Sequence, residues 1–405
     1  MLPSRWGSFR SGAALARRNR AELLEGLRPC FARTEPWLQA GKYVAAVTSD
    51  LRRPNGWRIA ERSGDRTPDR TQRLLNRAVW DTFAAMGVVR RFAVAGLDEA
   101  ARKTGRPRAL AVGAIDETGQ VKAGARTAGV KRQYLGCVGK VADGINTVHL
   151  AYVREGTGHA LIGAREWIPA EHIGDPVTSA VMGLPEDLIF RTKGQLAIDV
   201  LTEAFADGVR LDFVCGDETY GSCTELREYL EDRDQAYVLR VPCSFRLAMT
   251  NGVTLTCKQA AARLGRRCWE VRSAGSGSKG QRWYARAWLA TASRRHHLLI
   301  RRHLATGELA FCYCYLPEGQ PVSPSRSIRA AGLRWPVEED FEFGKDCFGL
   351  DQSQVRLYVA IARHTVLVMA TLAICAVTAA LLRHRPASSH PPPHTRTSPR
   401  PPTPA

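Results

Sequence analysis

The sequence has 405 residues, of which 44% are hydrophobic, and it carries a formal net charge of +19. This length and apolar content allow at least one large buried core and exclude a wholly disordered chain. A positive surplus of this size repels itself unless the partner is a polyanion, so nucleic acid is the first candidate partner and a generally arginine-rich composition is the alternative.

Residues 1–103 are expected to form a helical DNA-binding domain. Within residues 53–81 (RPNGWRIAERSGDRTPDRTQRLLNRAVWD), a helical piece ends at Gly64, and Thr67 is expected to cap the next helix with Pro68 in its first turn. This arrangement is helix-turn-helix-like, and its arginines favour DNA contact over a purely structural role.

Residues 104–241 are predicted to form the first part of an α/β core. Four strand-like segments, RALAVGAIDE, QYLGCVGKV, INTVHLAYV and HALIGAREWIP, are separated by turn residues and predict an antiparallel meander. A helix, a strand, a second helix and a second strand follow over residues 193–241. A meander followed by this alternation is typical of the ribonuclease-H-like fold.

The remainder of the chain divides into three predicted parts. Residues 242–327 alternate strand-like pieces such as QRWYARAWLATA with the break GSGSKG and are expected to be a β-rich insertion. Residues 328–382 should supply the C-terminal helices of the ribonuclease-H-like core. The uncharged stretch 365–382 is at the lower edge of a membrane-spanning length, and a buried core helix is favoured over a membrane span. Residues 383–405, rich in proline and arginine, are expected to be a disordered tail.

Two features of the sequence bear on cellular location. The N-terminus has no apolar segment long enough for a secretory signal. The eleven cysteines form no CxxC pair and show no Cys/His spacing suited to zinc, which is typical of a reduced compartment. We therefore expect a cytoplasmic protein that is associated with the nucleoid when it is bound to DNA, and no membrane partner.

Two aspartates stand at the expected ends of strands that would be neighbours in this sheet. Asp116 ends the first apolar strand and Asp217 ends the strand beside it. Carboxylates at this range raise each other's pKa unless a cation lies between them, and oxygen ligands favour magnesium or manganese over zinc. Glu117 and Glu218 rank second, because neighbouring residues on a strand point to opposite faces.

The stretch RWPVEEDFEFGK offers a third carboxylate. At about 100° per residue in a helix, Glu338 and Lys345 share the face of Arg334. Glu342 shares this face too, so helical geometry alone does not choose between the two glutamates. The alternative is a solvated Arg–Glu pair on a helix surface. Three carboxylates could together hold two metal ions at a scissile phosphate.

Four stretches in this order resemble the DDE transposases of bacterial insertion sequences, in the branch with a Y-R-E-K signature and a β-rich insertion. They are RPNGWRIAERSGDRTPDRTQRLL, AIDETGQVKAGARTAGVKRQYLGCVGKV, VCGDETYG and RWPVEEDFEFGKDCFGLDQSQVR. The resemblance runs from about residue 31 to residue 378. It implies cut-and-paste transposition with two Mg²⁺ or Mn²⁺ ions, in which a homodimer on paired ends binds double-stranded DNA at the terminal inverted repeats, cleaves it and joins it to a target.

The resemblance also implies roles for particular residues. Asp116, Asp217 and Glu338 correspond to the catalytic, metal-binding triad, and the spacing R-x3-E-x6-K selects Glu338 over Glu342. The arginine and lysine of that signature are Arg334 and Lys345, which would contact DNA. The signature places a tyrosine three residues before the arginine, where this chain has alanine. A catalytically inactive, transposase-derived DNA-binding protein is therefore the alternative function.

Four further basic residues lie near the first aspartate along the chain. Lys122, Arg126, Lys131 and Arg132 are spaced along a loop and strand that would border the site. We expect them to follow the phosphate backbone of DNA, and a solvated loop is the alternative.

Overall fold

The computed structural model describes residues 9–49, 51, 54–277 and 280–383. Helices form the N-terminal part of the chain: α1 (Phe9–Leu27), η1 (Arg28–Cys30), α2 (Thr34–Val47), α3 (Gly56–Ser63), α4 (Asp69–Asn76) and α5 (Thr82–Lys103). Gly64 ends α3 with a φ of 71°, as predicted. The prediction for Thr67 was wrong by one residue, because Pro68 is the N-cap of α4 and the Thr67 hydroxyl instead donates to Asp69.

The central part of the chain contains a meander followed by alternating helices and strands. The meander consists of β1 (Ala111–Val121), β2 (Lys131–Leu135), η2 (Gly136–Val138), β3 (Lys140–Arg154) and β4 (Gly158–Glu166). Next come α6 (Ala170–Gly174), α7 (Pro176–Met182), α8 (Lys193–Ala206), β5 (Phe213–Gly216), α9 (Glu218–Ser222), α10 (Thr224–Glu231) and β6 (Tyr237–Val241). The segment QYLGCVGKV is not one strand, because the chain turns at Gly139, where φ is 63°, and pairs β2 with β3.

The C-terminal part begins with strands and ends with long helices. Its elements are β7 (Arg246–Ala248), β8 (Thr254–Thr256), α11 (Cys257–Ala262), η3 (Arg266–Cys268), β9 (Glu270–Gly277), β10 (Gly280–Ala290), β11 (His296–His303), β12 (Leu309–Tyr315), α12 (Pro324–Gly332), α13 (Pro336–Phe348) and α14 (Tyr358–Leu382). The predicted tail lies outside the described residues except for Arg383.

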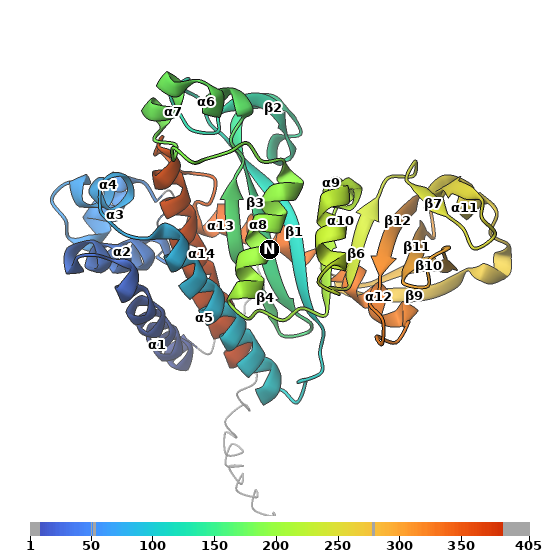
Figure 1. Cartoon of the computed structure of the whole chain (residues 1–405). Helices are drawn as coiled ribbons and strands as arrows, with labels where there is room; N and C mark the ends of the chain where they lie inside the picture. The colour runs from blue at the N-terminus through green and yellow to red at the C-terminus, as the bar shows by residue number, and fades with distance from the viewer. Residues whose placement is uncertain (1–8, 50, 52–53, 278–279, 384–405) are drawn as a thin grey trace, which may run out of the picture.

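One large mixed sheet organises the molecule. Its core runs in the order β4, β3, β1, β5, β6, in which β3 pairs antiparallel with β1 and β4, and β5 pairs parallel with β1 and β6. This confirms the predicted mixed α/β core, with parallel strands added to a meander. The β-rich segment continues the same sheet, because β12 pairs with β6 and is followed by β11, β10 and β9. In Figure 1 this extension projects on the side of the core opposite to helices α1–α4.

Helix α14 lies inside the fold. It is long and apolar enough to cross a membrane, but most of it is buried against α5, β4 and the N-terminal helices. Two buried polar contacts join it to those helices: Asn19 Nδ2 donates to Thr378 Oγ1 over 2.9 Å, and Tyr43 Oη lies 2.8 Å from His364 Nδ1. The structure thus places the uncharged stretch 365–382 in a core helix, which was the favoured interpretation.

Candidate active site

The sheet register brings the two predicted aspartates side by side. Ile115 on β1 is paired with Gly216 on β5, so Asp116 and Asp217 follow at the same level of two neighbouring parallel strands. The prediction that Asp116 ends its strand was wrong, because β1 continues to Val121 through its pairing with β3. The strand that does end here is β5, and Asp217 caps α9 by accepting a hydrogen bond from the Thr219 amide over 2.9 Å.

The start of α13 adds a carboxylate and a guanidinium to this position. Arg334 Nη1 lies 2.6 Å from Asp116 Oδ2 and 3.9 Å from Glu338 Oε1. Glu338 is therefore the glutamate that faces the aspartates, whereas Glu342 is exposed further along the helix. The next two acids of α13, Glu339 and Asp340, turn away and contact a histidine on β4, as their angles on the helix require.

The charges of Glu338 and Asp217 both act on the Asp116 carboxyl group. Burial raises the pKa of Asp116 to about 7; the Arg334 charge opposes this shift, and the charges of Glu338 and Asp217 reinforce it. Burial also raises the pKa of Asp217, helped by the nearby Glu117 carboxylate. Groups from β1, β5 and α13, which are far apart in the sequence, therefore form one electrostatically coupled acidic cluster.

A second cluster lies on the opposite face of β1, and of its members only Glu117 was considered from the sequence, as a second-ranked carboxylate. Glu117 Oε1 lies 2.6 Å from Lys193 Nζ, and its Oε2 accepts a hydrogen bond from the Tyr220 hydroxyl over 2.7 Å. Strand alternation explains why Glu117 is directed away from Arg334. No local signal singled out Lys193 or Tyr220, because their contacts with Glu117 join residues 76 and 103 positions apart in the sequence.

A comparison with known families assigns the chain to a family. A family model described as DDE superfamily endonuclease matches residues 26–302. The chain belongs to this family. Membership places this endonuclease among nucleases of the transposase type, with DNA as the substrate. The match includes Asp116 and Asp217 but ends before α12 and α13, so the place of Glu338 in the site rests on the geometry above. A comparison with curated proteins finds no significant match.

Endonucleases of this superfamily generally use divalent metal ions. Within the described ranges, no three His, Cys, Asp or Glu side chains are arranged to hold a metal ion, and the guanidinium of Arg334 lies among the carboxylates. The donor set nevertheless fits a hard cation. Asp116 is buried with a raised pKa, and a divalent ion beside it would favour the ionised carboxylate, as Arg334 does here.

Lys345 lies on the same side of the sheet as Asp116. Burial and, to a lesser extent, the charge of Lys345 lower the pKa of His149 to about 3. His149 is directly opposite Asp116 in the pairing of β1 with β3. In the part of the chain that the structure describes, no carboxylate pairs with Lys345, so its ammonium group is available to a ligand.

The other basic residues predicted to contact DNA occupy different environments. Lys122 Nζ donates to the Ser353 carbonyl oxygen, and burial lowers the pKa of this lysine. Lys131 Nζ pairs with the first-turn glutamate of α6 at 2.6 Å. Arg126 and Arg132 are exposed. Lys122 therefore serves an internal contact, whereas the two arginines face solvent.

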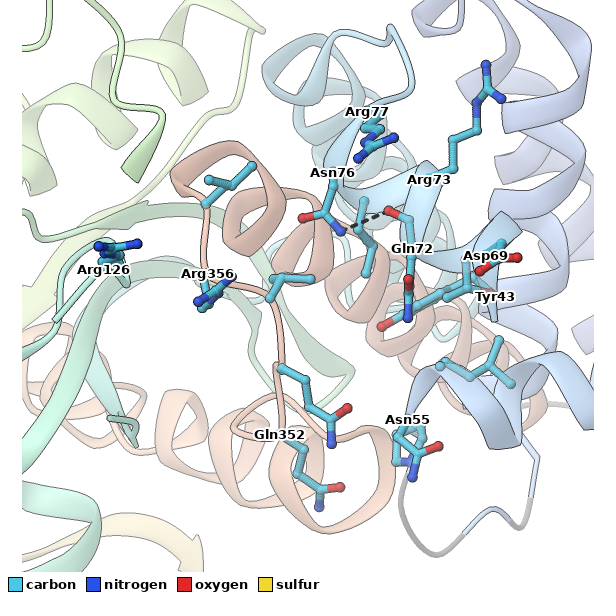
Figure 2. Close-up of a pocket in the computed structure, with 18 of the residues that line it drawn as sticks. Tyr43, Asn55, Asp69, Gln72, Arg73, Asn76, Arg77, Arg126, Gln352 and Arg356 are labelled. Atoms are coloured by element: carbon cyan, nitrogen blue, oxygen red, sulfur yellow. Dashed lines mark hydrogen bonds between the residues drawn. The ribbon is translucent and has the colours of Figure 1, made fainter. Parts of the chain in front are cut away.

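A polar groove of about 1090 Å³ separates α3 and α4 from the segment that precedes α14. Figure 2 shows Arg126 and Arg356 on one side of this groove, with Asn55, Gln72 and Asn76 on the other. The sequence did not predict the groove, because its walls come from segments that are remote along the chain. The side chains that line it with amide or guanidinium groups are Asn55, Gln72, Arg73, Asn76, Arg77, Arg126, Gln352, Gln354 and Arg356.

The groove is anchored close to the acidic cluster. Gln120 Nε2 on β1 donates to the Ser353 carbonyl oxygen over 2.9 Å, which fixes the segment that forms one wall. Gln120 follows Asp116 by four residues, a separation of roughly 13 Å along a strand. One duplex could therefore reach both regions.

Proposed function

We propose that this protein is a DDE transposase that binds the terminal inverted repeats of a transposon and catalyses metal-dependent DNA cleavage and strand transfer. The observation that carries the proposal is the convergence of Asp116, Asp217 and Glu338 around Arg334. A nuclease that uses metal ions needs such a set of oxygen ligands, and phosphate binding needs the cation beside it.

In the proposed site the three carboxylates hold the metal ions. Two Mg²⁺ or Mn²⁺ ions bound there would activate the attacking water or 3′-hydroxyl and stabilise the leaving oxygen. Arg334 and Lys345 bind phosphate oxygens near the cleaved bond, because both cations lie on the Asp116 side of the sheet. Lys193 and Tyr220 hold Glu117 on the other face, which keeps that carboxylate away from Arg334.

The N-terminal helices and the polar groove are the proposed duplex-binding surface. Asparagine and glutamine amides can read adenine edges, and arginine can bind either guanine edges or phosphates. Both groups line the groove: amides at Asn55, Gln72 and Asn76, and guanidinium groups at Arg126 and Arg356. We expect α3 and α4 to supply sequence recognition while the core cleaves nearby DNA.

A nicking assay tests the proposal. Purified protein is incubated with DNA that carries the inverted repeats flanking the gene, with and without Mg²⁺. The wild type should nick at the repeat ends only with the metal, and Asp116→Ala should abolish nicking without abolishing binding. Glu342→Ala, an exposed change on the same helix as Glu338, is the matched control and should nick normally. Equal nicking by Asp116→Ala would refute the assigned chemistry.

The same assay separates the second candidate function, an inactive DNA-binding protein. Ala331 stands where the related signature has a tyrosine, and Arg334 is paired with Asp116. Specific binding of the repeats without nicking, at any Mg²⁺ or Mn²⁺ concentration, would favour this alternative. We also propose a homodimer on two paired ends and a cytoplasmic, nucleoid-associated protein. Crosslinking of the two ends through the protein, dependent on both repeats, tests the dimer.

A further inference from the structure

The sheet face that carries Asp116 continues onto the β-rich extension. Strands β1, β5, β6 and β12 are hydrogen-bonded neighbours in this order. Side chains two residues apart on a strand share a face, and by this alternation Arg240 on β6 and Cys312 on β12 point to the same side as Asp116. Arg334, the partner of Asp116, also lies within electrostatic reach of the Cys312 thiol.

Three arginine side chains surround Cys312 on this face. Arg240 is directly opposite Cys312 in the pairing of β6 with β12. Arg286 and Arg301 are directly opposite each other on β10 and β11. Burial raises the pKa of the Cys312 thiol, and the positive charges of these three arginines and of Arg334 oppose the shift. Strands β6, β10 and β11, together with the turn before α13, thus bring four guanidinium groups towards the Cys312 side chain on β12.

The carboxylates nearby balance this charge only in part. Arg240 Nη2 lies 3.0 Å from Glu218 Oε1. Among the described residues no carboxylate pairs with Arg301, whose guanidinium lies 4.8 Å from the centre of the Tyr284 ring. Arg286, which is 5% exposed, lies 5.4 Å from the same ring. No described carboxylate therefore balances the charge of Arg301, and a bound anion would stabilise it.

We propose that Arg240 and Arg301 form a phosphate-binding site that holds a DNA strand beside the cleavage point. The inference rests on the proposed transposase function and assigns the β-rich extension a role in it. Guanidinium groups match phosphate oxygens with two parallel hydrogen bonds. With strands about 4.8 Å apart, Arg240 lies roughly 10 Å across the sheet from Asp116 and Arg301 roughly 19 Å, which is enough to follow several phosphates.

The salt dependence of DNA binding tests this site, because each phosphate contact adds to it irrespective of sequence. A short fluorescein-labelled duplex is titrated with wild type, Arg240→Ala and Arg301→Ala over a range of salt concentrations, and binding is followed by anisotropy. The matched control is Arg302→Ala, since Arg302 is the next residue on β11, is exposed and lies over Trp269 on the other face. Each site variant should lower the slope of log K against log salt by about one, and the control should not.

Unchanged slopes in Arg240→Ala and Arg301→Ala, or equal losses in Arg302→Ala, would overturn the proposal. The Arg240 side chain is 36% exposed, so Arg240→Ala should fold. If Arg301→Ala does not fold, the slope measured for Arg240→Ala decides whether the site binds phosphate. Arg301→Lys should keep the slope, because it keeps the charge. Failure of the transposase assignment has a different readout: wild-type protein would bind the duplex with the same salt dependence but would not nick repeat ends with Mg²⁺.

Discussion

Asp116→Asn should stabilise the metal-free protein while it removes a proposed metal ligand. Burial, with the charges of Glu338 and Asp217, raises the pKa of Asp116 from its ordinary value of 3.8 to about 7, although Arg334 opposes the shift. The folded state therefore binds a proton more tightly than the unfolded chain. The stability that this proton confers is fully present below pH 3.8 and is lost as the pH rises to about 7.

The difference between these pKa values corresponds to about 4 kcal/mol of unfolding free energy above neutral pH. Asparagine cannot ionise, so the unfolding free energy of the variant does not fall as the pH rises through this range. Urea unfolding in EDTA at a series of pH values should show Asp116→Asn more stable than the wild type at pH 8, with the advantage shrinking towards pH 4. Added Mg²⁺ should then stabilise the wild type more than the variant, because a ligand stabilises the state that binds it.

Glu342→Gln is the control for this experiment, because Glu342 is exposed and one helical turn from Glu338. It should leave the pH dependence of the unfolding free energy unchanged. A variant Asp116→Asn that is less stable than the wild type at pH 8 without metal would refute the reasoning. Such a result would mean that Arg334 stabilises the ionised Asp116 carboxylate by more than burial destabilises it.

Three further predictions concern buried residues of the core. Arg90, whose side chain is 1% exposed, pairs with Asp207 and donates to the Ile162 carbonyl oxygen, so Arg90→Ala should lower the unfolding free energy by about 3 kcal/mol in urea titrations. A Cβ at Gly221 would meet the Arg240 carbonyl oxygen at less than 3.0 Å, so Gly221→Ala should cost about 1–3 kcal/mol or prevent folding. Burial raises the pKa of Glu166, so the wild-type protein loses unfolding free energy as this group ionises with rising pH. Glu166→Gln should therefore be more stable than the wild type at pH 8 but not at pH 4.

The first two of these predictions each have a control that shares their chemistry. Arg91→Ala removes an arginine that pairs with the same aspartate but is 54% exposed, and it should cost less than about 1 kcal/mol. Gly174→Ala adds a methyl group where no atom lies within 4 Å and should be tolerated. Equal losses for Arg90→Ala and Arg91→Ala, tolerance of Gly221→Ala, or a pH-independent effect of Glu166→Gln would contradict the respective explanation.

The sequence by itself determined the kinds of element and their order. Alternating apolar residues predicted the meander, and the segments after residue 193 predicted the helices and strands that complete the α/β core. These signals are local, because the period of apolar residues and the turn residues lie within one segment. The acids Asp116, Asp217 and Glu338 could be named for the same reason, since each lies in a short recognisable stretch.

Only the tertiary structure decided which of these groups meet. Register between β1 and β5 placed the aspartates at one level, and the packing of α13 turned Glu338 rather than Glu342 towards them. Local patterns also could not reveal that Lys122 is used internally, that the β-rich segment extends the core sheet, or that segments remote along the chain form a polar groove. Contacts between distant residues depend on strand pairing and helix packing, and neither is encoded in the spacing of residues along one element.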